Sequence, residues 1–429
     1  MTLIGAGARP LHAETTPLDL PQELLPTPLV GFGDAQRPLL WQRAGAGLAG
    51  YGEALRLEFT GPTRMRDAAQ AWRELSASAT VDDELELPGT GLVAFGAFAF
   101  SSRSRARSLL IVPQTVIGTR GGHSWLTRIA PAGEALPDGP VIAPLGAASV
   151  TALVPGAMTP EAYRAAVASA VATIRGGGTG SGGETGHLLE KVVLARELRG
   201  RLGPDADVRR LLGSLASAYP DCWTFAVDGF VGASPETLVS VDRGRVSARV
   251  LAGTAARGTD AMSDRRAEEA LLDSAKDGAE HAFALASLLD ALHPHTRALS
   301  ASPRPFALEL PNLWHLASDV EGTLDDSSSA LDLVDALHPT AAVAGTPTAE
   351  ALDLLDALEP FDRRRYAGPV GWIDGAGGGE WAVGLRSAEI DADGTITAWA
   401  GAGIVADSDP DAELAETSMK FRPMLDALG

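Results

Sequence analysis

Acidic side chains, a lysine and two closely spaced glycines gather near the end of the chain. Glu413, Glu416 and Lys420 are spaced i, i+3, i+7, so they share one face of an expected helix. A glycine-rich turn expected at Gly401-Ala402-Gly403 precedes that helix. Backbone N–H groups in such a turn suit a carboxylate, and paired carboxylates suit a hard divalent cation. The segment therefore predicts an anion site beside a metal site.

A second acidic stripe lies in a long helix expected over residues 263–292. Its members are Glu269, Asp273, Asp277 and Glu280. Most acidic stripes are solvated helix faces, but packing against Glu413 and Glu416 would place four carboxylates around one cation. Mg²⁺ takes one or two such ligands and keeps several waters. The histidines show no H-x-x-x-H spacing, so a zinc site is not expected.

Lys191 and Glu236 are the candidate base and acid. Lys191, Val193 and Ala195 share one face of an expected strand, and desolvation there would lower the lysine pKa. The alternative is a lysine that protects a sheet edge. Glu236 lies on a Ser-Pro turn between strands, where burial would raise its pKa and keep it protonated. The alternative is a solvated turn glutamate.

Arg386 and Tyr366 are candidate ligands for an anion. Arg386 alternates with apolar residues on an expected strand, and a guanidinium is the natural partner of a substrate carboxylate. Tyr366 would add a hydroxyl donor.

Short strands and helices surround these residues without strict alternation. Strands and one helix (65–77) are expected before residue 150, and a helix over 159–174 follows. The glycine-rich stretch 176–186 has a helix before it and a strand after it, the reverse of a dinucleotide-binding fingerprint, so it is interpreted as a flexible loop. A hairpin-like region is expected over 368–390. The pattern favours an α+β fold, with no linker to divide residues 1–429.

Composition limits the partners. The formal charge is −20 and the isoelectric point is near 4.8, which disfavours nucleic acid and anionic membranes. There is one cysteine, Cys222, and no apolar run long enough to span a bilayer. A cytoplasmic protein is expected.

Nine motifs in one order resemble the chorismate-utilising enzymes, which include the anthranilate synthase component I-like proteins, and within them the isochorismate synthases. They are KVVLARE at 191–197, FVGASPETL at 230–238, LAGTAARG at 251–258, SAKDGAEH at 274–281, PNLWHLASDVEGTL at 311–324, LHPTAAVAGTP at 337–347, RRYAGPVGW at 364–372, GEWAVGLRSAEI at 379–390 and AGAGIVADSDPDAELAETSMK at 400–420.

The resemblance implies a reaction. Water adds to C2 of chorismate while the C4 hydroxyl leaves, and the product is isochorismate. By resemblance Lys191 deprotonates the water and Glu236 protonates the departing hydroxyl. Glu280 and Glu416 bind Mg²⁺, with Glu413 and Asp277 as water-mediated partners. The implied substrate ligands are Lys420 and Gly403 for the ring carboxylate, Arg386 and Tyr366 for the enolpyruvyl carboxylate, and Thr254, His315 and Ala342 around the ring.

The resemblance also implies an architecture and a place within the family. One chorismate-binding domain of two stacked antiparallel sheets with outer helices is expected. Residues 1–150 supply strands to the common core, and residues 155–429 carry the motifs. A lysine at 191 favours isochorismate synthase over the ammonia-using relatives, so no glutaminase subunit is expected, and relatives are often monomers. Salicylate synthase, which goes on to eliminate pyruvate, and a non-catalytic chorismate-binding homologue stay open as alternatives. Ala341 departs from the LHPTPAV pattern of isochorismate synthases.

Overall fold

The computed structural model describes residues 9–19, 28–139, 143–147, 150–177, 188–310 and 313–429. Most of the glycine-rich stretch 176–186 falls outside these ranges. Two sheets dominate the fold, a large sheet of 13 strands and a small sheet of 10. All pairings are antiparallel except that of β1 with β5, so the fold is α+β, as predicted.

The large sheet runs, in spatial order, through β10 (Val154–Pro155), β11 (Lys191–Arg201), β23 (Thr395–Ile404), β22 (Ser387–Ile390), β13 (Phe230–Ser234), β12 (Trp223–Val227), β2 (Leu39–Arg43), β3 (Ala46–Tyr51), β8 (Thr115–Arg120), β9 (His123–Pro131), β1 (Leu11–Pro17) and β5 (Thr80–Asp83), with β19 (Gly345–Thr346) beside β11. The small sheet runs through β16 (Thr296–Ala301), β18 (Leu313–Leu324), β15 (Arg245–Ala256), β14 (Thr237–Asp242), β21 (Gly379–Val383), β20 (Pro369–Asp374), β6 (Val93–Ala97), β7 (Ser108–Val112) and β4 (Leu55–Phe59), with β17 (Phe306–Glu309) beside β18. Strands from before residue 150 therefore enter both sheets.

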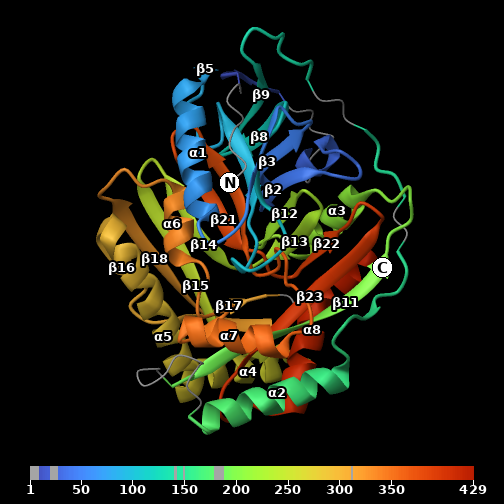
Figure 1. Ribbon diagram of the computed structural model, residues 1–429, viewed down its shortest axis with the longest axis vertical. Coiled ribbons are helices and arrows are strands. Elements are labelled where there is room, and N and C mark those ends of the chain that lie inside the picture. The colour runs from blue at the N-terminus through green and yellow to red at the C-terminus, as the bar shows by residue number, and fades with distance from the viewer. Residues whose placement is uncertain (1–8, 20–27, 140–142, 148–149, 178–187, 311–312) are drawn as a thin grey trace.

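The helices lie outside the sheets. They are α1 (Arg64–Ser78), α2 (Pro160–Arg175), α3 (Val208–Ala218), α4 (Ala261–Asp273), α5 (Ala275–Leu292), α6 (Ala330–Leu337), α7 (Thr348–Leu358) and α8 (Pro410–Leu428). In Figure 1, α2, α4, α5, α7 and α8 gather at the lower end; α2, α7 and α8 contact β11 or β23, and α4 and α5 contact β15 and β18. Most of these helices begin with a side-chain cap: Thr159, for example, accepts from the N–H of Ala162 at the start of α2.

Aromatic side chains fill the space between the sheets. Trp41 of the large sheet and Trp372 of the small sheet are fully buried, and both donate to Oε2 of Glu380, at 3.0 and 3.1 Å. Arg120 donates to Oε1 of the same carboxylate at 2.8 Å. A buried carboxylate is thus fully hydrogen-bonded between two apolar layers, which is the condition for burying it at low free-energy cost.

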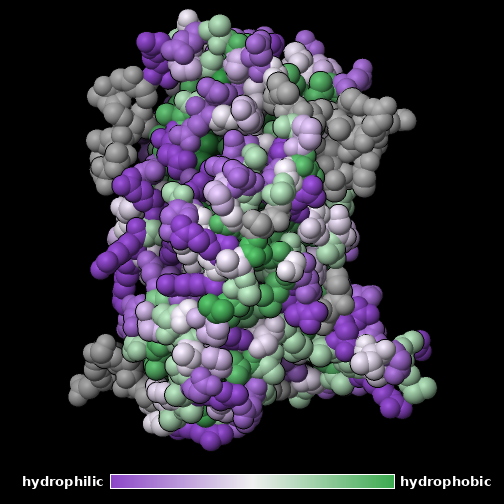
Figure 2. All heavy atoms as spheres, turned by 90° about the vertical axis from the view of Figure 1, so that its right-hand side faces the viewer, coloured by the Kyte–Doolittle hydropathy of each residue, from purple (hydrophilic) through white to green (hydrophobic). Residues whose placement is uncertain are grey.

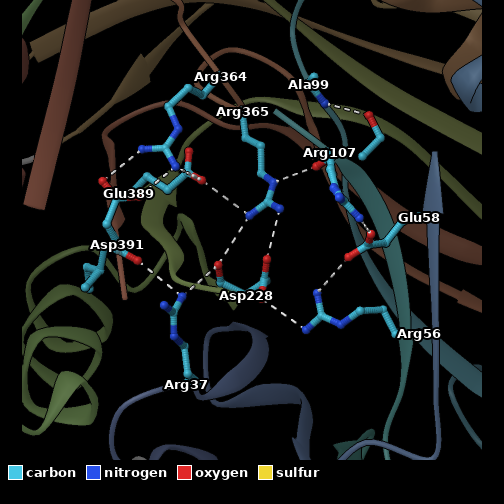
Figure 3. Close-up of polar contacts among 12 residues, drawn as sticks. Arg37, Arg56, Glu58, Ala99, Arg107, Asp228, Arg364, Arg365, Glu389 and Asp391 are labelled. Atoms are coloured by element: carbon cyan, nitrogen blue, oxygen red, sulfur yellow. Dashed lines mark hydrogen bonds and ion pairs between the residues drawn. The ribbon is translucent and has the colours of Figure 1, made fainter. Parts of the chain in front are cut away.

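A second set of buried charges joins the sheets, and we call it the Asp228 network (Figure 3). Its central residues are Arg56, Asp228, Arg365 and Glu389. Asp228 Oδ1 accepts from Arg56 Nη2 at 3.1 Å and Oδ2 accepts from Arg365 Nη2 at 2.9 Å. Arg365 also reaches Glu389 at 3.4 Å. Because Arg56 lies on the small sheet and Asp228 and Glu389 belong to the large one, the network ties the two sheets together.

Several details of the predicted secondary structure are wrong. The helix expected over 263–292 is broken, because Ser274 adopts an extended conformation, ends α4 and caps α5. Glu269 and Asp273 therefore belong to a different helix from Asp277 and Glu280. The hairpin expected over 368–390 includes only β20 and β21, since β22 joins the other sheet.

The expected Gly401–Gly403 turn is also wrong. These residues continue β23, which pairs with β11 from Thr395 to Ile404. The absence of a side chain at Gly403 lets Lys191 lie close to the backbone of β23, because a Cβ on Gly403 would lie 2.9 Å from Cε of Lys191.

Candidate active site

One cavity of about 320 Å³ collects every site residue predicted from the sequence. Those residues are Lys191, Glu236, Thr254, Asp277, Glu280, His315, Ala342, Tyr366, Arg386, Gly403, Glu413, Glu416 and Lys420. They come from strands of both sheets, from the connections between them, and from α5 and α8. Segments more than 200 residues apart along the chain therefore meet in one concave site.

Lys191 begins β11, a strand that lies between β19 and β23 in the large sheet. It pairs with Thr346 of β19, while the next residue pairs with Ile404 of β23, so the alternative of an edge lysine is wrong. Its side chain is 12% exposed, and Nζ lies 2.5 Å from Oε1 of Glu280. The amine thus stands at the wall of the cavity with a carboxylate as its partner.

Glu236 lies where the chain crosses from one sheet to the other. β13 ends at Ser234 in the large sheet and β14 starts at Thr237 in the small sheet. The glutamate is 6% exposed, so the alternative of a solvated turn residue is wrong. Burial raises the pKa of Glu236 to about 7, against the opposing pull of Lys191, Arg386 and Lys420. The group is therefore a proton donor at neutral pH or below.

Arg386 occupies a second crossing between the sheets. It precedes β22 with φ of 48°, in the connection from β21, and does not lie on a strand as predicted. Its Nη2 lies 3.5 Å from Nε2 of His315. Burial and the nearby Arg386 lower the pKa of His315 to about 3, so this imidazole is neutral. His315 Nδ1 is 3.0 Å from the hydroxyl of Thr254 on the neighbouring strand.

Tyr366 closes the same wall. It is buried, stacks on Trp399 with ring centroids 6.0 Å apart, and burial raises its pKa to about 12. The hydroxyl therefore stays protonated and can donate to an anion. Arg386 and Tyr366 together provide charge and a hydroxyl donor in one region of the cavity.

Two helices bring the acidic residues. Asp277 and Glu280 lie in the first turns of α5, and Glu413 and Glu416 lie on α8. Glu416 Oε1 accepts from Lys420 Nζ at 2.6 Å; burial raises the pKa of Glu416, but Lys420, Arg386 and Lys191 together lower it below its usual value, so the group stays ionised. Lys420 also donates to the carbonyl of Gly401 at 3.0 Å.

The donor set fits Mg²⁺ with one or two protein carboxylates. Among the described residues, no three carboxylate, histidine or cysteine side chains converge to hold an ion, so the acidic residues do not form a four-carboxylate cage. Glu280 and Glu416 nevertheless line one cavity as half-buried carboxylates, each beside a lysine. Hard oxygen donors with room for water are what Mg²⁺ selects.

Gly403 turns its backbone toward the cavity. Val193 gives its N–H to Ala344 O, so its pairing with Gly403 is a non-hydrogen-bonded one. The N–H of Gly403 therefore points away from β11, where a ligand could accept it. The predicted role as an anion donor is compatible with a strand as well as with a turn.

Arg363 lines the cavity and was not predicted. It is 4% exposed and paired with Glu359, which is equally buried. The signal in the sequence was the i, i+4 spacing of these two residues, which predicts an ion pair near a helix end. Nothing in the sequence indicated that the pair would be buried beside Lys191.

No helix among the described residues is long and apolar enough to cross a membrane. On the face drawn in Figure 2, hydrophilic and hydrophobic residues are interspersed.

Comparison with known proteins agrees with this geometry. A family model described as "Chorismate binding enzyme" matches residues 32–134 and 147–429. The isochorismate synthase DhbC of Bacillus subtilis is 40% identical over 282 residues, covering 63% of this chain and 68% of its own. The salicylate biosynthesis isochorismate synthase of Pseudomonas aeruginosa is 33% identical over 435 residues, covering 94% and 87%.

Solved structures show the same architecture. The structure of DhbC from Bacillus anthracis, a 2,3-dihydroxybenzoate-specific isochorismate synthase by its description, superposes with a TM-score of 0.75 at 31% identity. It covers 94% of this chain and 98% of its own. The menaquinone-specific isochorismate synthase MenF of Escherichia coli has a TM-score of 0.78 at 23% identity and covers 98% and 95%, which supports the fold alone. The chain therefore belongs to the family of chorismate-binding enzymes.

Proposed function

We propose that this protein is an isochorismate synthase. The observation that carries the proposal is the pairing, in one cavity, of an amine at Lys191 with a carboxylic acid at Glu236 whose pKa is about 7. By their names, the relatives from Bacillus subtilis and Pseudomonas aeruginosa are isochorismate synthases. A protein that only binds chorismate needs neither a base nor a protonated acid.

The proposed reaction exchanges one hydroxyl for another. Lys191 removes a proton from water, and the oxygen bonds to C2 of chorismate. Both ring double bonds shift and the C4–O bond breaks, while Glu236 gives its proton to the departing hydroxyl. One water enters and one leaves, so the change is an isomerisation. Burial of Glu236 keeps the proton available for transfer.

The substrate's two carboxylates have separate partners in this proposal. Arg386 and Tyr366 bind the enolpyruvyl carboxylate. The N–H of Gly403 and the ammonium of Lys420 bind the ring carboxylate. Thr254, His315 and Ala342 line the pocket beside the ring.

Mg²⁺ is the proposed cofactor. Glu280 and Glu416 would hold it, with Asp277 and Glu413 reached through water, and it would neutralise the ring carboxylate. With Mg²⁺ bound, Glu280 and Glu416 would act as ligands, and Lys420 would remain beside Glu416.

Product analysis tests the function. Purified protein with chorismate and Mg²⁺ is expected to form isochorismate without pyruvate, and excess EDTA is expected to stop the reaction until Mg²⁺ is restored. Formation of pyruvate and fluorescent salicylate would instead identify a salicylate synthase. Unchanged chorismate would identify a binding protein, and full turnover in metal-free buffer would refute the metal assignment.

We also propose that residues 1–429 act as one chorismate-binding domain, in the cytoplasm, as a monomer without a glutaminase subunit. Supporting this, strands from before residue 150 enter both sheets, and the connections that carry Glu236 and Arg386 bridge those sheets.

A further inference from the structure

Among the described residues, the outer edge of β11 has no neighbouring strand from Val193 to Glu197. β19 pairs only with Lys191 and Val192, and β10 pairs only with Leu198 and Arg199. Between these two short partners, the backbone of residues 193–195 needs other hydrogen-bonding groups, because an unpaired buried amide or carbonyl is destabilising.

Side chains of one ion pair supply most of those groups. The N–H of Ala195 donates to Oε1 of Glu359 at 2.8 Å. The carbonyl of Val193 accepts from Nη2 of Arg363. The N–H of Val193 donates to Ala344 O at 3.0 Å. Glu359 and Arg363 thus take the place of a strand along β11.

Arg363 also holds the segment that carries Ala342. Its Nη1 donates to the carbonyl of Val343 at 2.9 Å. Its Nε and Nη2 bind the two oxygens of Glu359 at 2.8 and 2.6 Å. The carbonyl of Arg363 accepts from the N–H of Tyr366 at 2.9 Å. One guanidinium therefore joins β11 to the segment across the cavity.

The chemistry requires arginine at this position. A guanidinium offers five donors in a rigid plane, whereas an ammonium is a single point that cannot reach two carbonyls and both oxygens of a carboxylate. The ring of Phe100 lies 4.5 Å from Cζ of Arg363 and covers the guanidinium. Both partners are 4% exposed, so the loss of a hydrogen bond between them is costly.

We propose that Arg363 and Glu359 form a positioning pair that sets the placement of Lys191 relative to Ala342 and Tyr366. The pair acts through the backbone of β11 and the 343–344 segment and makes no bond with the reacting atoms. The proposal rests on the proposed function, because it assigns the pair to the alignment of the base.

The test compares two buried arginines. Arg363→Lys removes the fork beside the cavity. Arg209→Lys is the matched control, because it removes an equally buried guanidinium outside the cavity. Arg209 and Asp207 are each 3% exposed and 2.7 Å apart, and Arg209 also donates to backbone carbonyls. Since a displacement of about 1 Å can lower turnover about 100-fold, Arg363→Lys is expected to lower kcat at least about tenfold with KM for chorismate nearly unchanged. Arg209→Lys is expected to lower Tm similarly and leave kcat unchanged.

Hydrogen exchange gives a readout that does not depend on turnover. In Arg363→Lys the amides of Val193 and Ala195 are expected to exchange faster, while the rest of the large sheet keeps its protection; in Arg209→Lys these amides keep theirs. Should the parent protein leave chorismate unchanged, the proposed function fails and the exchange experiment still tests the pair.

Two results would overturn the proposal. One is a parallel fall of kcat in both variants, which would indicate general loss of structure. The other is a raised KM with unchanged kcat in Arg363→Lys, which would indicate direct contact with substrate. If Arg363→Lys does not fold, Glu359→Gln decides. It retains an acceptor for Ala195 but weakens the grip on Arg363, so a lower kcat supports the proposal and an unchanged kcat refutes it.

Discussion

The active-site cavity and the Asp228 network both concentrate buried charge where the two sheets meet, yet they differ in how charges are partnered. In the network, Asp228 is bound by Arg56 and Arg365, and Glu389 by Arg364 and Arg365. Figure 3 shows these side chains converging on Asp228 and Glu389. In the cavity, lysines bind single carboxylates, and Glu236 holds its proton in a space of about 320 Å³.

This difference in partners suits the two regions to different tasks, one to stability and the other to chemistry. An arginine fork fixes its partners in place and cannot give up its proton. A lysine amine can exchange partners and protons, and a buried acid can give its proton away. The network is therefore suited to joining the sheets, and the cavity is suited to proton transfer. Changes in the two regions should separate turnover from stability.

The largest effect on turnover is expected from Lys191→Ala. Loss of a general base lowers kcat by about 10²–10⁴. Stability should change little, because Glu280, the partner left behind, is still 26% exposed to water. Steady-state kinetics and thermal unfolding check both parts. Arg201→Ala, on an exposed position of the same strand, is the control; near-normal turnover in Lys191→Ala would refute the assigned role.

The largest effect on stability is expected from Arg365→Leu. Breaking a buried ion pair by removing one partner costs about 3–5 kcal/mol, and here Asp228 and Glu389 both lose a donor. Denaturant unfolding measures this, and kcat of the folded protein should be unchanged. The exposed pair of Arg103 with Asp353 gives the control, because Arg103→Leu should change stability far less. A loss of kcat without a loss of stability would contradict the distinction.

Stability should also depend on the proton of Glu236. Its folded pKa of about 7 is above the ordinary value of 4.5 for a glutamate, so the folded state retains a proton that the unfolded state releases. The contribution of this group to the free energy of unfolding is therefore fully present below about pH 4.5 and is lost as pH rises to about 7. The loss is about 3 kcal/mol, because each unit of pKa difference is worth about 1.4 kcal/mol.

Glu236→Gln provides the comparison, because its amide does not titrate. The stability of the parent protein relative to this variant should fall between pH 4.5 and 7, as measured by denaturant unfolding. A difference that does not vary with pH would show that the carboxyl is ionised in the folded protein. Turnover should likewise decline above pH 7, as the acid loses its proton.

The smallest effect is expected from Gly403→Ala. The new Cβ would lie 2.9 Å from Cε of Lys191 and 3.5 Å from Nζ, so the amine must move. A shift of a fraction of an ångström should lower kcat about tenfold. Gly213→Ala on α3 is the control, since its nearest neighbour is 4.0 Å away and alanine favours a helix by about 0.5–1 kcal/mol. Equal kcat in both variants would show that the lysine position is not critical.

The sequence predicted the residues better than the conformations that hold them. The i, i+3, i+7 spacing of Glu413, Glu416 and Lys420 sufficed to place all three on the cavity side of α8. By contrast, Gly401–Gly403 was predicted to be a turn, because glycine is common in turns. The sequence does not distinguish such a glycine from one in a strand that lets another side chain approach the backbone closely. The break at Ser274 was missed since the apolar and acidic periodicity continues across it.

By itself, the sequence determined which groups are available: an amine, an acid, carboxylates on helix faces and an arginine for an anion, in an α+β chain with a strongly acidic surface. The tertiary structure decided which of them act together. Glu236 becomes an acid only because β13 and β14 belong to different sheets and bury their connection. Glu359 and Arg363 complete an edge of β11 that no local pattern marks as incomplete. Burial and long-range pairing set these properties, and both depend on contacts between segments far apart in the chain.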